Sequence, residues 1–161
     1  MEHKERILKY LEENAKYTPK NIADALGISE QEVTDVIREC EADGTILGYK
    51  TMINWDKTER EYVSALIEIK VLPVKGEGFD SVAEYICSFP EVVSVSLMSG
   101  GFDLAVLIEG KTMKEVAYFV AQKLAPIEDV ISTATHFVLR KYKDKGIVYG
   151  APEKDERGNC N

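Results

Sequence analysis

The sequence predicts an α+β protein with an N-terminal winged helix-turn-helix and a C-terminal ferredoxin-like βαββαβ domain. Two short capped helices meet at Gly27, and strand and helix patterns alternate through the second half of the chain. The predicted boundaries are a helix-turn-helix domain at 1–55, a linker at 56–61, a ferredoxin-like domain at 62–139 and a partly disordered C-terminal extension at 140–161.

The first two predicted helices follow from caps and apolar spacing. Apolar residues on one face between Glu2 and Asn14 predict a supporting helix. Thr18 can then cap a helix whose first residue is Pro19, where a missing N–H costs nothing. Gly27 ends that helix, because glycine adopts positive φ cheaply.

The third predicted helix runs from Ser29 to Gly44. Ser29 and Glu32 have the spacing of a capping box, in which each side chain accepts a backbone N–H. The β-forming residues from Thr45 to Asn54 predict the wing or a linking strand. A helix-turn-helix of this kind usually places its second helix in the major groove of DNA, although any two capped helices joined by glycine share the pattern.

Carboxylates dominate this third helix. Its only basic residue is Arg38, and its acidic residues are Glu30, Glu32, Asp35, Glu39, Glu41 and Asp43. Gln31, Thr34 and Arg38 recur at helical spacing and could still reach base edges, while Lys20 and Lys50 could hold phosphates. We predict weak or salt-sensitive binding of double-stranded DNA at these five residues; the alternative is a solvated helix face with ordinary surface lysines.

The composition indicates a globular protein and argues against nucleic-acid coat, membrane and disulfide-rich proteins. The chain has 161 residues, 45% hydrophobic and 30% charged, with a formal net charge of −8, which argues against a general nucleic-acid coat protein. No signal peptide or long apolar run is present, so we expect a cytoplasmic protein without membrane contact. Cys40, Cys87 and Cys160 are too far apart for a disulfide framework or metal site, and the first two are expected in cores.

The second half has the order βαββαβ. Strands are predicted over Tyr62–Leu72, Val92–Met98, Phe102–Ile108 and Val130–Leu139. Amphipathic helices after Phe79 and Thr112 should cover one sheet face. The opposite face is apolar enough to favour a two-fold homodimer, and its expected residues are Ser64, Leu66, Ser96, Met98, Ala105 and Leu107.

Three blocks resemble the Lrp/AsnC family of feast/famine regulators: IADALGIS from Ile22, EADGTILGY from Glu41 and SGGFDLAV from Ser99. The resemblance covers nearly the whole chain. It implies a DNA-binding domain joined to an effector-binding domain, dimers that assemble into octameric discs, and sensing of amino acids or related metabolites. Val36 stands where the family often has an arginine, which puts DNA affinity or target choice in question.

The resemblance also implies an effector site at the turn between the second and third strands of the ferredoxin-like domain. Its candidate residues are Met98, Ser99, Gly100, Gly101, Phe102 and Asp103. Backbone N–H groups of the glycines could approach a carboxylate, and Asp103 could pair with an α-ammonium. Thr133, Thr135 and His136 are expected as second-side donors. The alternatives are an ordinary hairpin turn, a turn-capping carboxylate and a packed strand histidine.

The sequence predicts no enzyme, catalytic residue, metal site or cofactor. It has no nucleophile elbow, phosphate-binding glycine loop or dinucleotide fingerprint. Sirohaem decarboxylases share this architecture, but an acidic C-terminal domain with one histidine suits a tetrapyrrole poorly. Two functions remain: a sequence-specific transcription regulator that responds to an amino acid, or a metabolite-sensing oligomer with weak or no DNA binding that modulates a paralogue.

Overall fold

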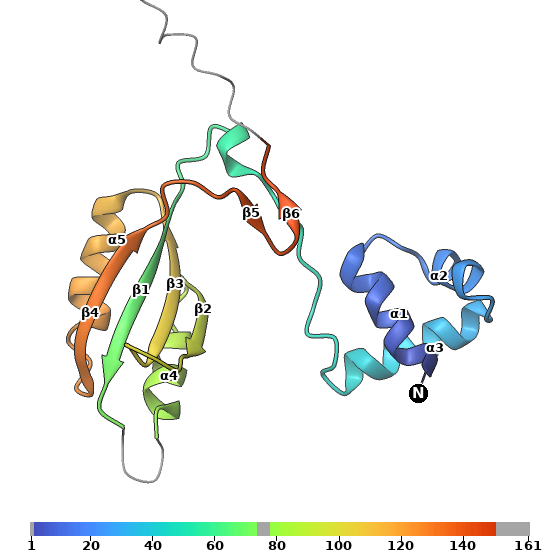
Figure 1. Cartoon of the computed structure of the whole chain (residues 1–161), viewed down its shortest axis with the longest axis horizontal. Coiled ribbons are helices and arrows are strands. Elements are labelled where there is room, and N and C mark those ends of the chain that lie inside the picture. Colours follow the sequence, from blue (N-terminus) through green and yellow to red (C-terminus); the bar gives the residue numbers. More distant parts are fainter. Residues whose placement is uncertain (1, 74–77, 151–161) are drawn as a thin grey trace, which may run out of the picture. The chain divides into compact units, whose positions relative to one another are not determined.

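The structure is a computed structural model that describes residues 2–73 and 78–150. Contacts within the chain divide it into two compact units, Met1–Ile53 and Asn54–Asn161 (Figure 1). Within the described residues, no helix is both long and apolar enough to cross a membrane.

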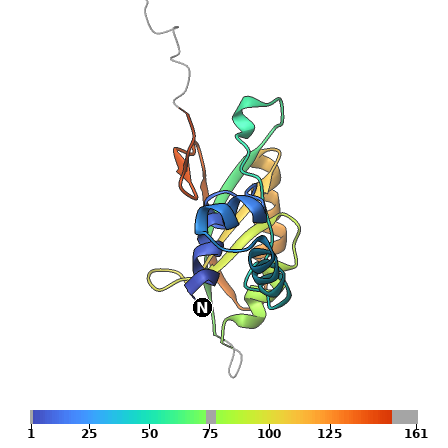
Figure 2. The same cartoon turned by 90° about the vertical axis from the view of Figure 1, so that its right-hand side faces the viewer.

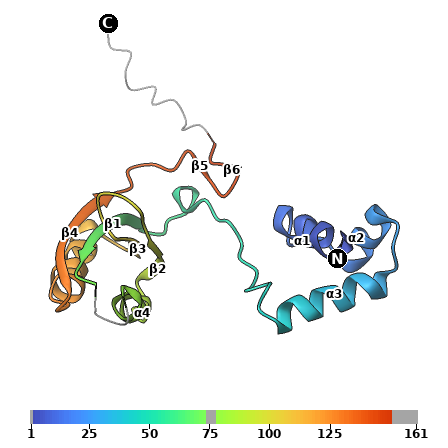
Figure 3. The same cartoon turned by 60° about the horizontal axis from the view of Figure 1, so that its bottom comes forward.

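The N-terminal unit is built from three helices, α1 (Glu2–Glu13), α2 (Pro19–Leu26) and α3 (Glu30–Ala42) (Figure 3). Ile7, Ile22 and Val33 are fully buried and join the helices into one small core. Gly27 takes the left-handed conformation at φ 68° and allows the chain to turn into α3. The predicted helix-turn-helix is confirmed.

Two local predictions in this unit are wrong. The reciprocal capping box lies at Thr18 and Asn21. Ser29 caps α3 as predicted, but the Glu32 carboxylate does not complete a box there and is hydrogen-bonded to His3. The strand predicted over Thr45–Asn54 is absent, since the described chain there has no β-ladder partner. Residues with high β propensity need a neighbouring strand to form a sheet, and none of the strands among the described residues pairs with this segment.

The C-terminal unit contains the predicted βαββαβ order. After a short 3₁₀ helix, η1 (Trp55–Lys57), its elements are β1 (Val63–Val71), α4 (Asp80–Cys87), β2 (Val92–Leu97), β3 (Leu104–Gly110), α5 (Met113–Phe119), the π-helical turn η2 (Val120–Leu124) and β4 (Val130–Phe137). The antiparallel sheet has the strand order β2-β3-β1-β4 (Figure 1). This is the ferredoxin-like arrangement.

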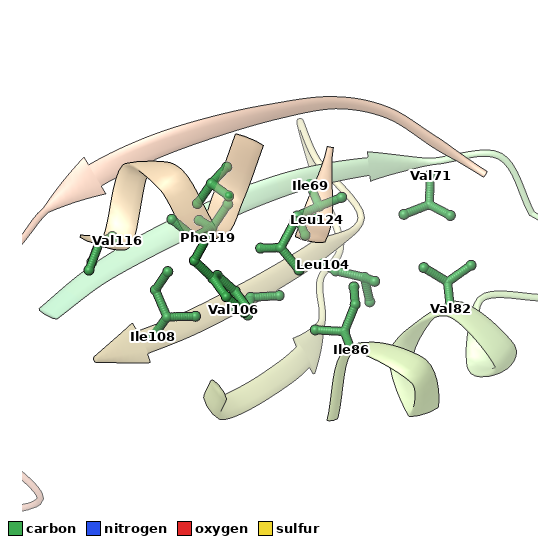
Figure 4. Packing of buried hydrophobic residues seen from close by; sticks show 13 residues of the cluster. Ile69, Val71, Val82, Ile86, Leu104, Val106, Ile108, Val116, Phe119 and Leu124 are labelled. Carbon is green, nitrogen blue, oxygen red and sulfur yellow. The ribbon is translucent and has the colours of Figure 1, made fainter. Parts of the chain in front are cut away.

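The core of this unit lies between the sheet and its two helices. Ile86 from α4 and Phe119 from α5 face Val106 and neighbouring side chains of the sheet (Figure 4). Alternate residues of β1 are fully buried on this side, as the period of two predicts. Cys87 is exposed, so its predicted core position is wrong; Cys40 is buried as expected, and Cys160 lies outside the described residues.

The opposite sheet face is uncovered within the described unit. Leu66 pairs with Leu107 across the β1–β3 ladder, and Ala105 stands beside Glu68 and Ser96. Ser64 shares this face yet is only 3% exposed, while Met98 lies past the end of β2. The face is therefore a mixture of aliphatic and polar side chains, as the alternation predicts.

A hairpin, β5 (Lys143–Asp144) and β6 (Ile147–Val148), occupies the segment expected to be a solvated extension. Lys145 and Gly146 both have positive φ and form its two-residue turn. Lys141, just before the hairpin, donates to the Tyr62 hydroxyl at 3.3 Å, so the extension is attached to the domain. The predicted disorder from Ala151 onward falls outside the described residues.

Candidate DNA-binding helix and effector site

The exposed surface of α3 consists of an outward face between two acidic sides, one with Glu30 and Glu41 and the other next to α1. Val33 and Cys40 are buried, and an angle of 100° per residue then places Gln31, Asp35 and Arg38 together on the face that points away from the core. Glu32, Glu39 and Asp43 lie on a separate side, next to α1. The outward face is therefore less acidic than the composition of the helix suggests.

Basic residues of α1 accompany the carboxylates on that second side. His3 Nδ1 lies 2.7 Å from Glu32 Oε1, and Lys4 Nζ lies 3.3 Å from Asp43 and 3.9 Å from Glu39. Hydrogen bonds from the side chain and backbone of Thr45, followed by Lys4, lower the pKa of Asp43 below its usual value. Lys4 therefore partly neutralises Glu39 and Asp43 inside the N-terminal unit, and Glu32 is hydrogen-bonded to His3.

The outward face contains a hydrogen-bonded cluster centred on Asp35. Its Oδ1 accepts from Gln31 Nε2 at 3.0 Å and from Arg38 Nη1 at 3.2 Å. Asp35 and Arg38 are 53% and 70% exposed, so the cluster is open to a ligand. Thr34 is half-buried and its hydroxyl donates to the Glu30 carbonyl at 2.9 Å, which places it at the margin of the predicted reading strip.

The two predicted phosphate-binding lysines are exposed. Lys20 lies in the first turn of α2, and Lys50 lies in the irregular segment that follows α3. Their solvated ammonium groups can contact phosphate oxygens without rearranging the core. Sequence reasoning missed Asp35 as a member of the site, although its spacing from Gln31 and Arg38 was visible.

The predicted effector turn projects beyond the ends of β2 and β3 (Figure 2). Met98 N–H donates to the Asp103 carbonyl at 2.8 Å and closes the turn, while Gly100 has φ 143°, which favours glycine. Ser99, Gly100 and Gly101 are exposed. Within the described chain, no backbone bond engages the N–H groups of residues 99–102, so they are available to an anion.

Asp103 has a structural partner in the turn. Its Oδ2 accepts from Val71 N–H at 2.9 Å, and its own N–H donates to the Ile69 carbonyl at 3.0 Å. One carboxylate oxygen thus fastens the turn to the end of β1, in agreement with the turn-capping alternative. Binding of an ammonium group would have to use the other oxygen.

The structure places Thr133 and Thr135 on one face of the sheet and His136 on the other. Thr133 and Thr135 pair with Ile69 and Ile67 and therefore share their helix-covered side of the sheet, whereas His136 pairs with Leu66 on the uncovered face. His136 Nε2 lies 3.4 Å from Glu68 Oε1 there. His136 therefore lies on the opposite face from the two threonines, because neighbouring residues of a strand point to opposite faces. A role of these three residues as second-side donors stays a prediction.

A shallow pocket lies beside the effector turn. It is formed between α4 and the ends of β2 and β3, and its lining includes Phe79, Ala83, Val95, Leu97 and Leu104, with Asp80, Glu84 and Cys87 at its polar parts. Leu97 and Leu104 directly flank the turn. This apolar pocket could not be predicted from the sequence, because its residues come from segments that are distant in sequence.

Comparison with known proteins identifies the family. The sequence model of the Lrp/AsnC ligand binding domain matches residues 64–148, and that of a winged helix-turn-helix DNA-binding domain matches residues 2–46. The chain belongs to the Lrp/AsnC family. A relative from Bacillus subtilis (strain 168), the uncharacterised HTH-type transcriptional regulator YugG, is 45% identical over 97% of this chain and 95% of its own length. The chain is a DNA-binding transcriptional regulator of this family.

Solved structures with low sequence identity share the fold. AsnC of E. coli has a TM-score of 0.70 and 18% identity, with coverage of 91% of this chain and 97% of AsnC. A transcriptional regulator from Neisseria meningitidis, solved as a complex with L-Met, has a TM-score of 0.72 and 20% identity, with coverage of 89% and 92%. The predicted fold class, a helix-turn-helix followed by an α+β domain with an antiparallel sheet, is confirmed.

Proposed function

We propose that this Lrp/AsnC regulator binds a specific palindromic DNA site as a homodimer and that an amino acid or related metabolite alters its assembly or its DNA binding. The main support for DNA binding is the outward face of α3, which presents Gln31 and Arg38 with a single carboxylate, Asp35, between them. Arginine and glutamine are the donors that most often read guanine and adenine edges.

The effector part of the proposal rests on the projecting turn and the pocket beside it. Free N–H groups of residues 99–102 can hold an α-carboxylate, and the apolar lining near Leu97 and Leu104 can accept a side chain. The L-Met complex of the neighbouring fold from Neisseria meningitidis supports an amino acid as the class of effector.

Homodimer formation follows from the uncovered sheet face. Leu66, Ala105 and Leu107 would be shielded from water if two such faces packed across a two-fold axis. A two-fold pair also provides two α3 helices, which must reach half-sites about 34 Å apart on DNA. Family members form octamers, and the same turn would then lie where further dimers meet.

The DNA-binding proposal is tested by titrating the full chain into its own upstream region at low salt. Arg38→Ala should weaken specific binding by about tenfold or more, because it removes a base-reading donor. Arg6→Ala is the matched control, since Arg6 is an exposed arginine on α1. Equal binding by both variants would contradict base reading by α3.

The effector proposal is tested at Gly101. Gly101 has open space at the position of a Cβ and no positive φ, so Gly101→Val should fold normally. The valine side chain would cover the turn N–H groups. Any change in sedimentation that one of the twenty amino acids causes in the wild type should therefore be absent in Gly101→Val. An unchanged response in Gly101→Val would remove the turn from the effector site.

The second candidate function is a metabolite-sensing oligomer whose own DNA binding is weak and which modulates a paralogue. The acidic residues of α3 and Val36, at a position where the family often has arginine, favour it. This function predicts only a weak shift of the upstream DNA that is lost as salt rises, while the response to amino acids persists. Neither function makes the chain an enzyme, and the relatives named above are regulators.

A further inference from the structure

Asp35 occupies the centre of the outward face of α3, where a carboxylate is costly for a DNA-binding helix. It lies four residues after Gln31 and three before Arg38, and one of its oxygens holds both side chains at 3.0 and 3.2 Å. The other carboxylates beside α1 are accompanied by His3 and Lys4. Asp35 is therefore the acidic group that a base edge would meet between the two donors.

The pair formed by Asp35 and Arg38 matches the hydrogen-bonding groups of one base pair. In the major groove, guanine presents two acceptors, O6 and N7, and its partner cytosine presents one donor, the N4 amino group. Arginine donates to the guanine acceptors, and an aspartate accepts from cytosine N4. An exposed ion pair contributes little stability, so both side chains can exchange their mutual contact for base contacts.

We propose that Asp35 is a specificity-determining residue, whose carboxylate accepts from cytosine N4 while Arg38 donates to the guanine of the same or the adjacent base pair. This inference rests on the proposed DNA-binding function. The acidic centre of the helix would then select for base sequence, because a G·C pair supplies both the amino donor for Asp35 and the two guanine acceptors for Arg38. An A·T pair supplies an amino donor at adenine N6 but lacks the two guanine acceptors, and phosphates leave the carboxylate unpaired. Gln31, released from Asp35, remains free for a neighbouring base.

The experiment is selection of duplexes from a random-sequence library by the full-length wild type, Asp35→Asn and Glu39→Gln. The wild type should enrich a palindrome with a G·C pair inside each half-site. Asp35→Asn keeps the size of the side chain but replaces the carboxylate by an amide that pairs with adenine N6 and N7. The enrichment of A·T over G·C at this position should therefore rise by about tenfold relative to the wild type. Circular dichroism of both variants checks that α3 is retained.

Glu39→Gln removes the same charge from the α1 side of the helix, where the Glu39 side chain is 70% exposed. It should raise general DNA affinity as Asp35→Asn does, but keep the wild-type base preference. If all three proteins select the same consensus sequence, or if the wild-type half-site has no preferred G·C pair, the proposed role of Asp35 is overturned. The proposed DNA-binding function would survive either result. Absence of enrichment with every protein would overturn the proposed function as well.

Discussion

At the scale of single residues, the location of each carboxylate on α3 matters more than the number of carboxylates. Asp43 pairs with Lys4, which compensates part of its charge before DNA approaches, and Glu32 makes a hydrogen bond with His3. Asp35 instead shares the exposed face with the two candidate base readers. A net charge for the helix would hide this difference.

Tyr62 provides a residue-scale prediction about stability. Its hydroxyl donates to Glu109 Oε1 at 2.7 Å and accepts from Lys141 at 3.3 Å, in a partly buried position. Tyr62→Phe should lower the free energy of unfolding by about 1 kcal/mol, because the Glu109 carboxylate loses its partner. Urea denaturation measures the change, and Tyr118→Phe is the control, since Tyr118 is 61% exposed.

The same residue predicts a dependence on pH. Burial, followed by the hydrogen bond to Glu109, raises the pKa of Tyr62 above its ordinary value of 10.0. The folded state therefore retains a proton that the unfolded state releases, and stability falls as pH rises above about 10. The advantage of the wild type over Tyr62→Phe should shrink in that range. An advantage that grew instead would contradict the assigned hydrogen bond.

At the scale of elements, the cap of α3 links local structure to the DNA-binding face. The Ser29 hydroxyl oxygen accepts from Glu32 N–H at 3.1 Å and fixes the first turn, directly before Gln31. Ser29→Ala should destabilise the chain by about 1 kcal/mol in urea denaturation. Thr51→Ala, at an exposed position outside helices and strands, should leave stability unchanged; an equal loss in both variants would argue against the cap.

Helices and strands were predictable where their signals are local. Thr18, Pro19 and Gly27 set the limits of α2 within a few residues, and alternation in β1 placed its apolar side chains on the correct face. The strand expected after α3 failed because β propensity does not supply a partner strand. The hairpin around Lys145 and Gly146 had a readable turn signal that the charge of the tail obscured.

The candidate sites were predictable only in part. Gln31 and Arg38 share a face because helical spacing dictates it, but the pairing of His3 with Glu32 joins residues 29 positions apart and needed the tertiary structure. Thr135 and His136 could have been separated from sequence, since adjacent strand residues face opposite ways. The apolar pocket beside the effector turn depends on how α4 packs and could not be read from the sequence.

At the scale of the whole molecule, the uncovered sheet face predicts the state of assembly. Leu107→Glu places a charge where two faces would meet and should convert a dimer into a monomer in sedimentation equilibrium at micromolar concentration. Met113→Glu is the matched control, because Met113 is 50% exposed at the start of α5, away from this face. Loss of the dimer in the control alone would place the interface on the helices.

We propose that paired chains present two reading helices to DNA and that a small metabolite adjusts this assembly. Sedimentation velocity of the wild type, with and without its upstream duplex and each of the twenty amino acids, tests the claim most directly. We expect a dimer or a multiple of it that binds the duplex at low salt, and at least one amino acid that changes the mass or the bound fraction. A lone chain that ignores both the duplex and every amino acid would contradict the account.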